Sequence, residues 1–152
     1  MTRSILFVCL GNICRSPTAE GVTRKLAAAA GLDLVIDSAG TGNWHAGEPP
    51  CPGMVRAAAV SGYDISGLRA RQLTRADFSR FDLIVAMDGQ NLADIARARP
   101  PGATAEARLF TDYAPETGAT EVPDAYYTQD YSGALDLIEI CAERLVAALA
   151  AR

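Results

Sequence analysis

Residues 4–17 read Ser-Ile-Leu-Phe-Val-Cys-Leu-Gly-Asn-Ile-Cys-Arg-Ser-Pro, and this stretch decides the fold. Its first half, Ser4 to Val8, is a continuous apolar run of the kind found in strands buried on both faces of a parallel sheet. Its last residues, Ser16 and Pro17, predict a helix with serine as N-cap and proline at the first helical position. Apolar residues then recur on one helix face until Gly31, which is expected to end the helix. The stretch predicts a strand, a short loop and a helix.

The same alternation continues along the chain. Further strands are predicted at Leu34–Ile36 and Leu83–Val85, with a weaker candidate at Arg108–Phe110. Further helices are predicted at Pro52–Ser61, Gly89–Arg99 and Ser132–Ala151. Alternating strands and helices predict an α/β fold of three layers, in which helices cover both faces of a parallel sheet. We expect residues 1–152 to form one domain.

Ligands of such folds bind beyond the carboxyl ends of the strands, which points to the loop after Cys9. Two long irregular loops, Ser38–Pro50 and Thr111–Asp130, are expected to reach the same edge of the sheet.

The loop between the first strand and the first helix has the features of an anion cradle. Its backbone N–H groups, together with the free N–H groups and dipole of the following helix, can point at one anion. Gly11 and Asn12 are residue types that tolerate a left-handed backbone, which a tight curl requires. Arg15 adds a planar fork that matches two phosphate oxygens. The predicted phosphate-binding residues are Leu10, Gly11, Asn12, Ile13, Cys14, Arg15 and Ser16.

Cys9 lies at the base of this cradle and is the candidate nucleophile. The same positive field favours its thiolate form at neutral pH, and Ser16 is placed to donate a hydroxyl hydrogen bond to the sulfur. Attack on a phosphate ester would give a cysteinyl-phosphate that water then hydrolyses. The donors come from the backbone and from Arg15, so neither a metal nor another cofactor is expected.

The composition excludes other classes of protein. Lys and Arg number 14 against 18 Asp and Glu, and no basic run is present, which argues against a nucleic-acid partner. The apolar run near the N-terminus is too short for a membrane span or a signal peptide, so we expect a cytoplasmic protein with no membrane partner. Four cysteines are few and unevenly spaced, and they are expected to be reduced thiols.

The chain resembles the low-molecular-weight protein tyrosine phosphatase family. The family signature Val-Cys-x-Gly-Asn-x-Cys-Arg-Ser-Pro stands at residues 8–17. The resemblance includes Asp37-Ser38, Ala70-Arg71-Gln72, Met87-Asp88 and the segment from Pro123 to Tyr127. It implies a single phosphatase domain with a four-stranded parallel sheet flanked by helices. The implied activity is hydrolysis of protein phosphotyrosine, with Cys9 as nucleophile, Arg15 as phosphate clamp and Asp124 as general acid.

The resemblance also assigns residues around this centre. Trp44, Tyr126 and Tyr127 resemble the aromatic walls that hold a phenyl ring at the family's pocket mouth, and His45 is a further candidate for the rim. A carboxyl close to a bound phosphate is favoured in its protonated form, which suits Asp124 to donate a proton. The family usually has Pro at the position of Ala125, so the acid loop is expected to be more mobile here.

Asn12 and Ser38 resemble a pair that braces the loop by hydrogen bonding, and Asp88 is expected to brace the same site. In the family a cysteine at the position of Cys14 pairs reversibly with the nucleophile, which would protect Cys9 from irreversible oxidation. Cys51 and Cys141 have no comparable context. Cys141 is expected to pack in the core.

Alternative hypotheses assign the chain another substrate or another class of protein. Family members that act on phosphoarginine typically carry Thr where Ile13 stands, so Ile13 favours an aryl leaving group. Arsenate reduction requires a further pair of cysteines, and Cys51 and Cys141 look isolated. A zinc site does not fit the cysteine spacings. A non-catalytic phosphate-binding module would be expected to lose Cys9 or Asp124, and both are present. The expected partner is a phosphotyrosine-containing protein, and the chain is expected to be a monomer or a weak dimer.

Overall fold

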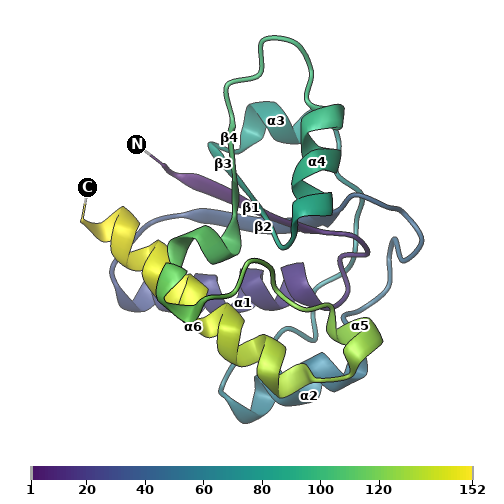
Figure 1. The fold of residues 1–152 in the computed structure, drawn as a ribbon, viewed down its shortest axis with the longest axis vertical. Helices are drawn as coiled ribbons and strands as arrows, with labels where there is room; N and C mark the ends of the chain where they lie inside the picture. The colour runs from purple at the N-terminus through teal and green to yellow at the C-terminus, as the bar shows by residue number, and fades with distance from the viewer. Residues whose placement is uncertain (1, 152) are drawn as a thin grey trace.

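The computed structural model describes residues 2–151 (Figure 1). Along the chain the elements are β1 (Ser4–Cys9), α1 (Arg15–Ala29), β2 (Val35–Gly40), α2 (Pro52–Val60), α3 (Asp77–Arg80), β3 (Leu83–Ala86), α4 (Gly89–Ala98), β4 (Glu106–Leu109), the 3₁₀ helices η1 (Phe110–Tyr113) and η2 (Pro115–Thr117), α5 (Ala125–Thr128) and α6 (Tyr131–Ala150). No helix within the described residues is long and apolar enough to cross a lipid bilayer.

The sheet is four-stranded and parallel, in the order β2-β1-β3-β4. The weaker strand candidate is therefore confirmed, although β4 ends at Leu109 and Phe110 begins a 3₁₀ helix. At its carboxyl end β1 pairs Cys9 with Gly40 and Val8 with Ala86, so β2 and β3 end on either side of Cys9. The predicted α/β class and the loop after the first strand are confirmed.

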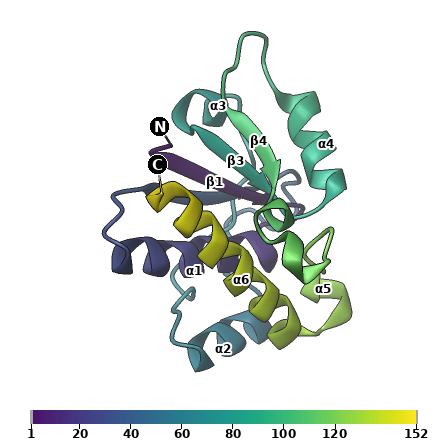
Figure 2. The same ribbon diagram turned by 60° about the vertical axis from the view of Figure 1, so that its left-hand side comes forward.

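Helices cover both faces of the sheet, as the sequence predicts (Figures 1 and 2). Ile5 and Phe7 of β1 belong to the core on the side of α1 and α6. Leu6 and Val8 alternate to the other face, where they join a core that contains Phe78 of α3 and residues of α4. This alternation follows from the period of two in a strand, and it explains why β1 is apolar throughout.

The first helix begins earlier than predicted. Cys14 is its N-cap and Arg15 its first residue, whereas the sequence predicts Ser16 as the cap. The physical reason is that the Ser16 hydroxyl contacts the side chains of Cys9 and Asn12 instead of a backbone N–H. The end of the helix agrees with the prediction, since Gly31 follows it with a positive φ of 74°.

The other helices end within one residue of their predicted bounds, whereas the long loops are more ordered than expected. β2 runs on to Gly40, into the segment predicted as the first loop. The second loop, 111–130, contains the short helix α5 as well as η2 and most of η1. α3 has no predicted counterpart.

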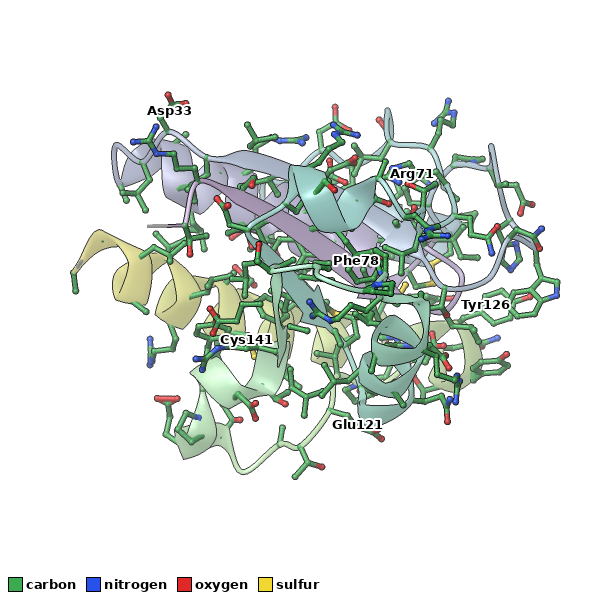
Figure 3. The ribbon with its side chains drawn as sticks, turned by 90° about the horizontal axis from the view of Figure 1, so that it is seen from above. Asp33, Arg71, Phe78, Glu121, Tyr126 and Cys141 are labelled. Atoms are coloured by element: carbon green, nitrogen blue, oxygen red, sulfur yellow. A yellow bond between two sulfur atoms is a disulfide. The ribbon has the colours of Figure 1, made fainter. Side chains whose placement is uncertain are left out.

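Figure 3 shows Tyr126 of α5 at one end of the molecule and Asp33, which precedes β2, at the opposite end. The loop after β1 and the ordered second loop thus meet where the strands end.

Candidate active site

The backbone of the loop after β1 turns its carbonyl groups outward. Three of these carbonyls accept hydrogen bonds from backbone N–H groups of the segment that follows β2. The acceptor–donor pairs are Cys9 with Thr41 at 2.9 Å, Leu10 with Gly42 at 2.9 Å, and Ile13 with Cys51 at 2.7 Å. With its carbonyls held outward, the loop can present N–H groups to its centre, and Asn12 N–H lies 3.2 Å from Cys9 Sγ.

Gly11 and Asn12 are the residue types in the loop that tolerate a left-handed backbone, and one of the two adopts it. Asn12 has a φ of 56°, whereas Gly11 is not among the residues with positive φ. Space favours a small residue at Gly11 instead, since a Cβ there would lie 3.0 Å from the imidazole of His45 and the ring would have to shift. The glycine thus allows the side chain of His45 to approach the loop.

Cys9 ends β1 at the base of the loop and is 3% exposed. Its Sγ lies 3.0 Å from Ser16 Oγ. Ser16 Oγ accepts a hydrogen bond from Asn12 Nδ2 at 2.8 Å, so its own hydrogen is available to the sulfur. No side chain caps α1, and its first turn carries no acidic residue, so its N-terminal N–H groups and dipole act on the same centre.

Arg15 is buried beside Cys9, and its guanidinium is only partly paired. Nη1 donates to Asp88 at 2.7 Å and to the Val122 carbonyl at 3.1 Å, and Nη2 donates to Asp124 at 3.4 Å. Burial acts to lower the pKa of Arg15, but Cys9, Asp88 and Asp124 outweigh it and raise the pKa above its ordinary value. Within residues 2–151, Arg15 Nε is buried and has no hydrogen-bond partner. This orphaned donor beside a thiol is suited to a phosphate oxygen.

Asp124 approaches the site from the segment before α5. It is the N-cap of α5, since its Oδ1 accepts a hydrogen bond from the Tyr126 N–H at 3.2 Å. Ala125 is fully buried and is the first residue of this helix. Proline is also tolerated at the first helical position, so Ala125 and the family's proline fit the same backbone.

A buried hydrogen-bond network supports the loop from behind. Asn12 Nδ2 donates to Ser38 Oγ at 2.9 Å, which is the contact expected of this pair. Asn12 Oδ1 accepts from the Arg71 N–H at 3.0 Å, and Ser38 Oγ donates to Glu20 at 2.6 Å. Sequence reasoning assigned neither Arg71 nor Glu20 a place in the site. For Glu20 the sequence carries no clear signal, because it lies off the apolar face that Ala19, Val22 and Leu26 define.

Glu20 is expected to make the stability of the fold depend on pH. Burial raises its pKa above the ordinary value of 4.5, although hydrogen bonding to Ser38 and the charge of Arg24 oppose the rise and Asp37 adds to it. A raised folded-state pKa gives stability that is complete below the unfolded pKa and is lost as the pH rises through the folded pKa. Between pH 4.5 and neutrality, we expect the free energy of unfolding to fall more for the native chain than for Glu20→Gln.

Urea unfolding at several pH values measures this difference, because glutamine keeps an acceptor for the Ser38 hydroxyl but cannot ionise. Glu143→Gln, a change on the exposed side of α6, is the matched control and should follow the native curve. Parallel curves for the native chain and Glu20→Gln would contradict a raised pKa at Glu20.

A pocket of about 360 Å³ opens above Cys9. Its lining residues are Cys9, Leu10, Gly11, Ile13, Cys14, Trp44, His45, Asp124, Tyr126 and Tyr127. The three aromatic residues predicted for the mouth are therefore brought together, and they are exposed by 70%, 49% and 71% in chain order. The Tyr126 ring lies 5.8 Å from the imidazole of His45 and 5.1 Å from the ring of Tyr127, measured between centroids. Such rings form an apolar wall for a flat group.

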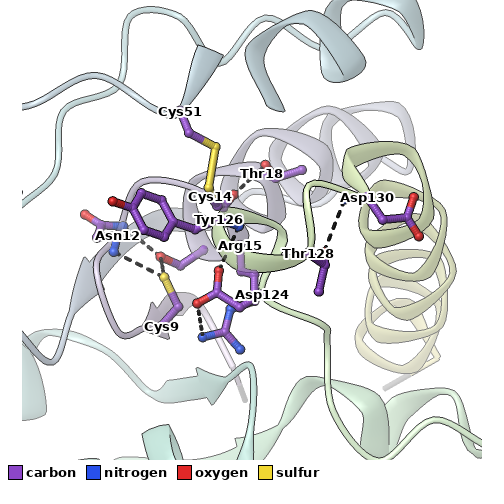
Figure 4. The surroundings of a disulfide bond; sticks show 11 residues. Cys9, Asn12, Cys14, Arg15, Thr18, Cys51, Asp124, Tyr126, Thr128 and Asp130 are labelled. Atoms are coloured by element: carbon purple, nitrogen blue, oxygen red, sulfur yellow. Dashed lines mark hydrogen bonds and ion pairs between the residues drawn. A yellow bond between two sulfur atoms is a disulfide. The ribbon is translucent and has the colours of Figure 1, made fainter. Parts of the chain in front are cut away.

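The prediction that all four cysteines are reduced and that Cys51 is isolated is wrong. Cys14 and Cys51 form a disulfide, with their Cα atoms 5.6 Å apart, while Cys9 and Cys141 are free thiols. Figure 4 shows the disulfide on one side of the loop and Cys9 on the other, close to Arg15 and Asp124. The physical reason is the Cys51 N–H···O=C Ile13 hydrogen bond, a tertiary contact between segments 38 residues apart.

Cys141 is fully buried in the core, as predicted, and burial raises the pKa of its thiol to about 11.

Comparison with known proteins identifies the family. A family model described as low molecular weight phosphotyrosine protein phosphatase matches residues 4–152. The chain belongs to this family. A relative from Schizosaccharomyces pombe, named low molecular weight phosphotyrosine protein phosphatase, is 46% identical over 132 residues, which cover 84% of each chain.

Two further family relatives have solved structures. The Bacillus subtilis low molecular weight protein-tyrosine-phosphatase YfkJ is 40% identical over 148 residues, covering 96% of this chain and 95% of YfkJ. Its crystal structure matches with a TM-score of 0.92 at 39% identity, over 98% and 95% of the two chains. A Drosophila arginine phosphatase matches with a TM-score of 0.90 at 29% identity, over 98% of each chain. The fold of this phosphatase family is thus present over nearly the whole chain.

Proposed function

We propose that the chain hydrolyses phosphotyrosine in proteins, and small aryl phosphates, through a cysteinyl-phosphate intermediate. The observation that carries this proposal is the buried Arg15 beside Cys9, whose Nε has no partner among residues 2–151. A buried, unsatisfied donor of a charged group is costly, and a phosphate oxygen would satisfy it. Two neighbours of Arg15 supply the other groups that hydrolysis needs. Cys9 supplies a nucleophile, and Asp124 supplies a proton.

In the first step the Cys9 thiolate attacks phosphorus, the ester P–O bond breaks, and Asp124 gives its proton to the leaving phenolate oxygen. A bound phosphate would accept the hydrogen bond that Arg15 Nη2 donates to Asp124 at 3.4 Å in the structure. Asp124 would then be released from Arg15 and free to face the leaving oxygen. In the second step Asp124 accepts a proton from water, which attacks the cysteinyl-phosphate and releases phosphate and the thiolate.

The pocket mouth supports an aryl substrate. Trp44 and Tyr126 stand at the rim, and Ile13 presents an apolar side chain to the same pocket. A phenyl ring spans the depth between rim and loop, whereas the short side chain of phosphoserine leaves the aromatic walls without a partner. The names of the S. pombe and B. subtilis relatives agree with this substrate class.

The test compares two peptides of one sequence that carry phosphotyrosine or phosphoserine, with a chelator and a reductant present. The proposal predicts phosphate release from the phosphotyrosine peptide and little from the other. Equal release from both peptides would contradict the aryl specificity. Phosphate binding without any turnover would favour a non-catalytic phosphate-binding module.

A cytoplasmic location and a monomer or weak dimer remain predictions.

A second candidate substrate is phosphoarginine, and the match to the Drosophila arginine phosphatase favours it. Ile13 is 8% exposed and lines the pocket. We expect Ile13→Thr to shift the ratio of kcat/KM for phosphoarginine over phosphotyrosine about tenfold toward phosphoarginine, the range of a single side-chain contact in a pocket.

Ile13→Val is the matched control for this shift, because valine has the shape of threonine without its hydroxyl. An equal shift in both variants would assign the effect to lost volume, and an unchanged ratio would refute the role of Ile13 in selectivity.

A further inference from the structure

Three cysteines gather around the loop after β1. Cys9 is a free thiol at its base, Cys14 caps α1 at its end, and Cys51 caps α2 and is bonded to Cys14. We propose that they form a thiol relay, in which an oxidised Cys9 is returned to its thiolate and the oxidation is left in the Cys14–Cys51 disulfide. The relay rests on the proposed function in one respect, that Cys9 is held as a reactive thiolate.

The backbone keeps Cys51 within reach of Cys14 whether or not the disulfide exists. The Cys51 N–H donates to the Ile13 carbonyl at 2.7 Å, immediately before Cys14 in the loop. The Cα atoms of the two cysteines are 5.6 Å apart, a separation that a disulfide spans without backbone movement. Reduction of the bond therefore leaves two thiols already placed to join again.

Cys14 is placed between the other two cysteines. Cys14 lies five positions after Cys9 in the loop, and both residues line the pocket. The Cys14 side chain makes no capping hydrogen bond to α1. In the structure its sulfur is bonded to Cys51, on the side of the loop away from Cys9 (Figure 4). Once reduced, the Cys14 thiol is released from Cys51 and lies on the same pocket as Cys9.

The chemistry balances with hydrogen peroxide as the oxidant. The Cys9 thiolate attacks one peroxide oxygen, the O–O bond breaks, and Cys9 sulfenic acid and hydroxide form. The Cys14 thiol then attacks the sulfenic sulfur, which gives the Cys9–Cys14 disulfide and releases the oxygen as water. Finally the Cys51 thiolate attacks the sulfur of Cys14, forming the Cys14–Cys51 disulfide and expelling the Cys9 thiolate.

The site favours this direction for the last step. The expelled sulfur, Cys9, accepts a hydrogen bond from the Asn12 N–H, faces Ser16 Oγ and lies beside the cation of Arg15. These contacts stabilise the negative charge that the departing sulfur acquires, which favours its expulsion. The attacking sulfur, Cys51, is held beside Cys14 by the hydrogen bond from the Cys51 N–H to the Ile13 carbonyl. The end state is the arrangement in the structure, with Cys14 bonded to Cys51 and Cys9 free.

The experiment starts from fully reduced protein freed of reductant and exposes it to an equimolar amount of hydrogen peroxide. Peptide mapping by mass spectrometry then locates the disulfide and the oxidation state of Cys9. Phosphatase activity is followed in parallel, relative to the same sample before peroxide. The variants are Cys51→Ser, in which serine suits the N-cap of α2, Cys14→Ser, and Cys141→Ala as a control remote from the pocket.

For the native chain and Cys141→Ala we expect the Cys14–Cys51 disulfide, a free Cys9 and most of the activity without added reductant. Cys51→Ser should stop at the Cys9–Cys14 disulfide and lose most of its activity until a dithiol is added. Cys14→Ser should stop at Cys9 sulfenic acid, and a second equivalent of peroxide should carry it to sulfinic acid, which a dithiol does not reverse.

The relay would be overturned if the native chain ended as Cys9–Cys14, or if Cys9 remained a sulfenic acid while Cys14 and Cys51 stayed reduced. The mapping of the native chain decides this even if a variant fails to fold. A native chain without phosphatase activity before peroxide would instead contradict the proposed function, and its disulfide map would still test the relay.

Discussion

Cys9→Ser is expected to lower kcat for p-nitrophenyl phosphate by more than about 10⁴-fold, as loss of a nucleophile does in other covalent enzymes. A serine hydroxyl in this cradle stays protonated at neutral pH, so the attacking anion is lost. Binding of inorganic phosphate should persist, because the N–H groups of the loop and Arg15 remain. Steady-state kinetics and calorimetric titration with phosphate measure the two effects separately.

Cys141→Ala is the matched control for this prediction, since it removes a cysteine that is buried away from the pocket. It should leave kcat almost unchanged. If Cys9→Ser kept full activity, Cys9 would not be the nucleophile. Loss of phosphate binding together with turnover would show that the substitution had disrupted the loop.

Asp124→Asn is expected to lower kcat by about 10²–10⁴-fold for phenyl phosphate, the range found when a general acid is removed. The loss should be smaller for p-nitrophenyl phosphate, whose leaving group departs without a proton. Asparagine is also a good N-cap, so α5 should keep its start. Kinetics over a series of phenols with different acidities measures the dependence on the leaving group.

Asp130→Asn is the control for this series, because Asp130 also caps a helix, α6, and does not line the pocket. It should change neither kcat nor the dependence on the leaving group. An equal loss for every phenol in Asp124→Asn would argue against a role for Asp124 in proton transfer.

The sequence predicts those parts of the fold that depend on local patterns. The apolar run of β1 and the residues from Cys9 to Pro17 predict a strand, a loop and a helix, and all three are present. The short helices α3 and α5 were missed because four residues carry too little periodicity to be recognised. The N-cap was placed at Ser16 because a serine before proline favours a cap, but in the folded chain its hydroxyl contacts Cys9 and Asn12.

Those parts of the site that depend on tertiary contacts were not predictable from the sequence. Val122 contributes a backbone carbonyl to Arg15, and a carbonyl is present at every residue. Glu20 reaches the loop only through Ser38 and Asn12. Cys51 looked isolated because its distance from Cys14 along the chain is 37 residues, and only the folded backbone brings the two together.

The most direct test of cysteinyl-phosphate chemistry is to trap the intermediate. The native chain, with its Cys14–Cys51 disulfide reduced beforehand, is mixed with p-nitrophenyl phosphate and quenched with denaturant during turnover. Digestion after arginine then releases residues 4–15 as one peptide. Fragmentation of this peptide in a mass spectrometer distinguishes Cys9 from Cys14. The proposed mechanism predicts one phosphoryl group on Cys9. Turnover with an unmodified Cys9, or with the phosphoryl group on another residue, would contradict it.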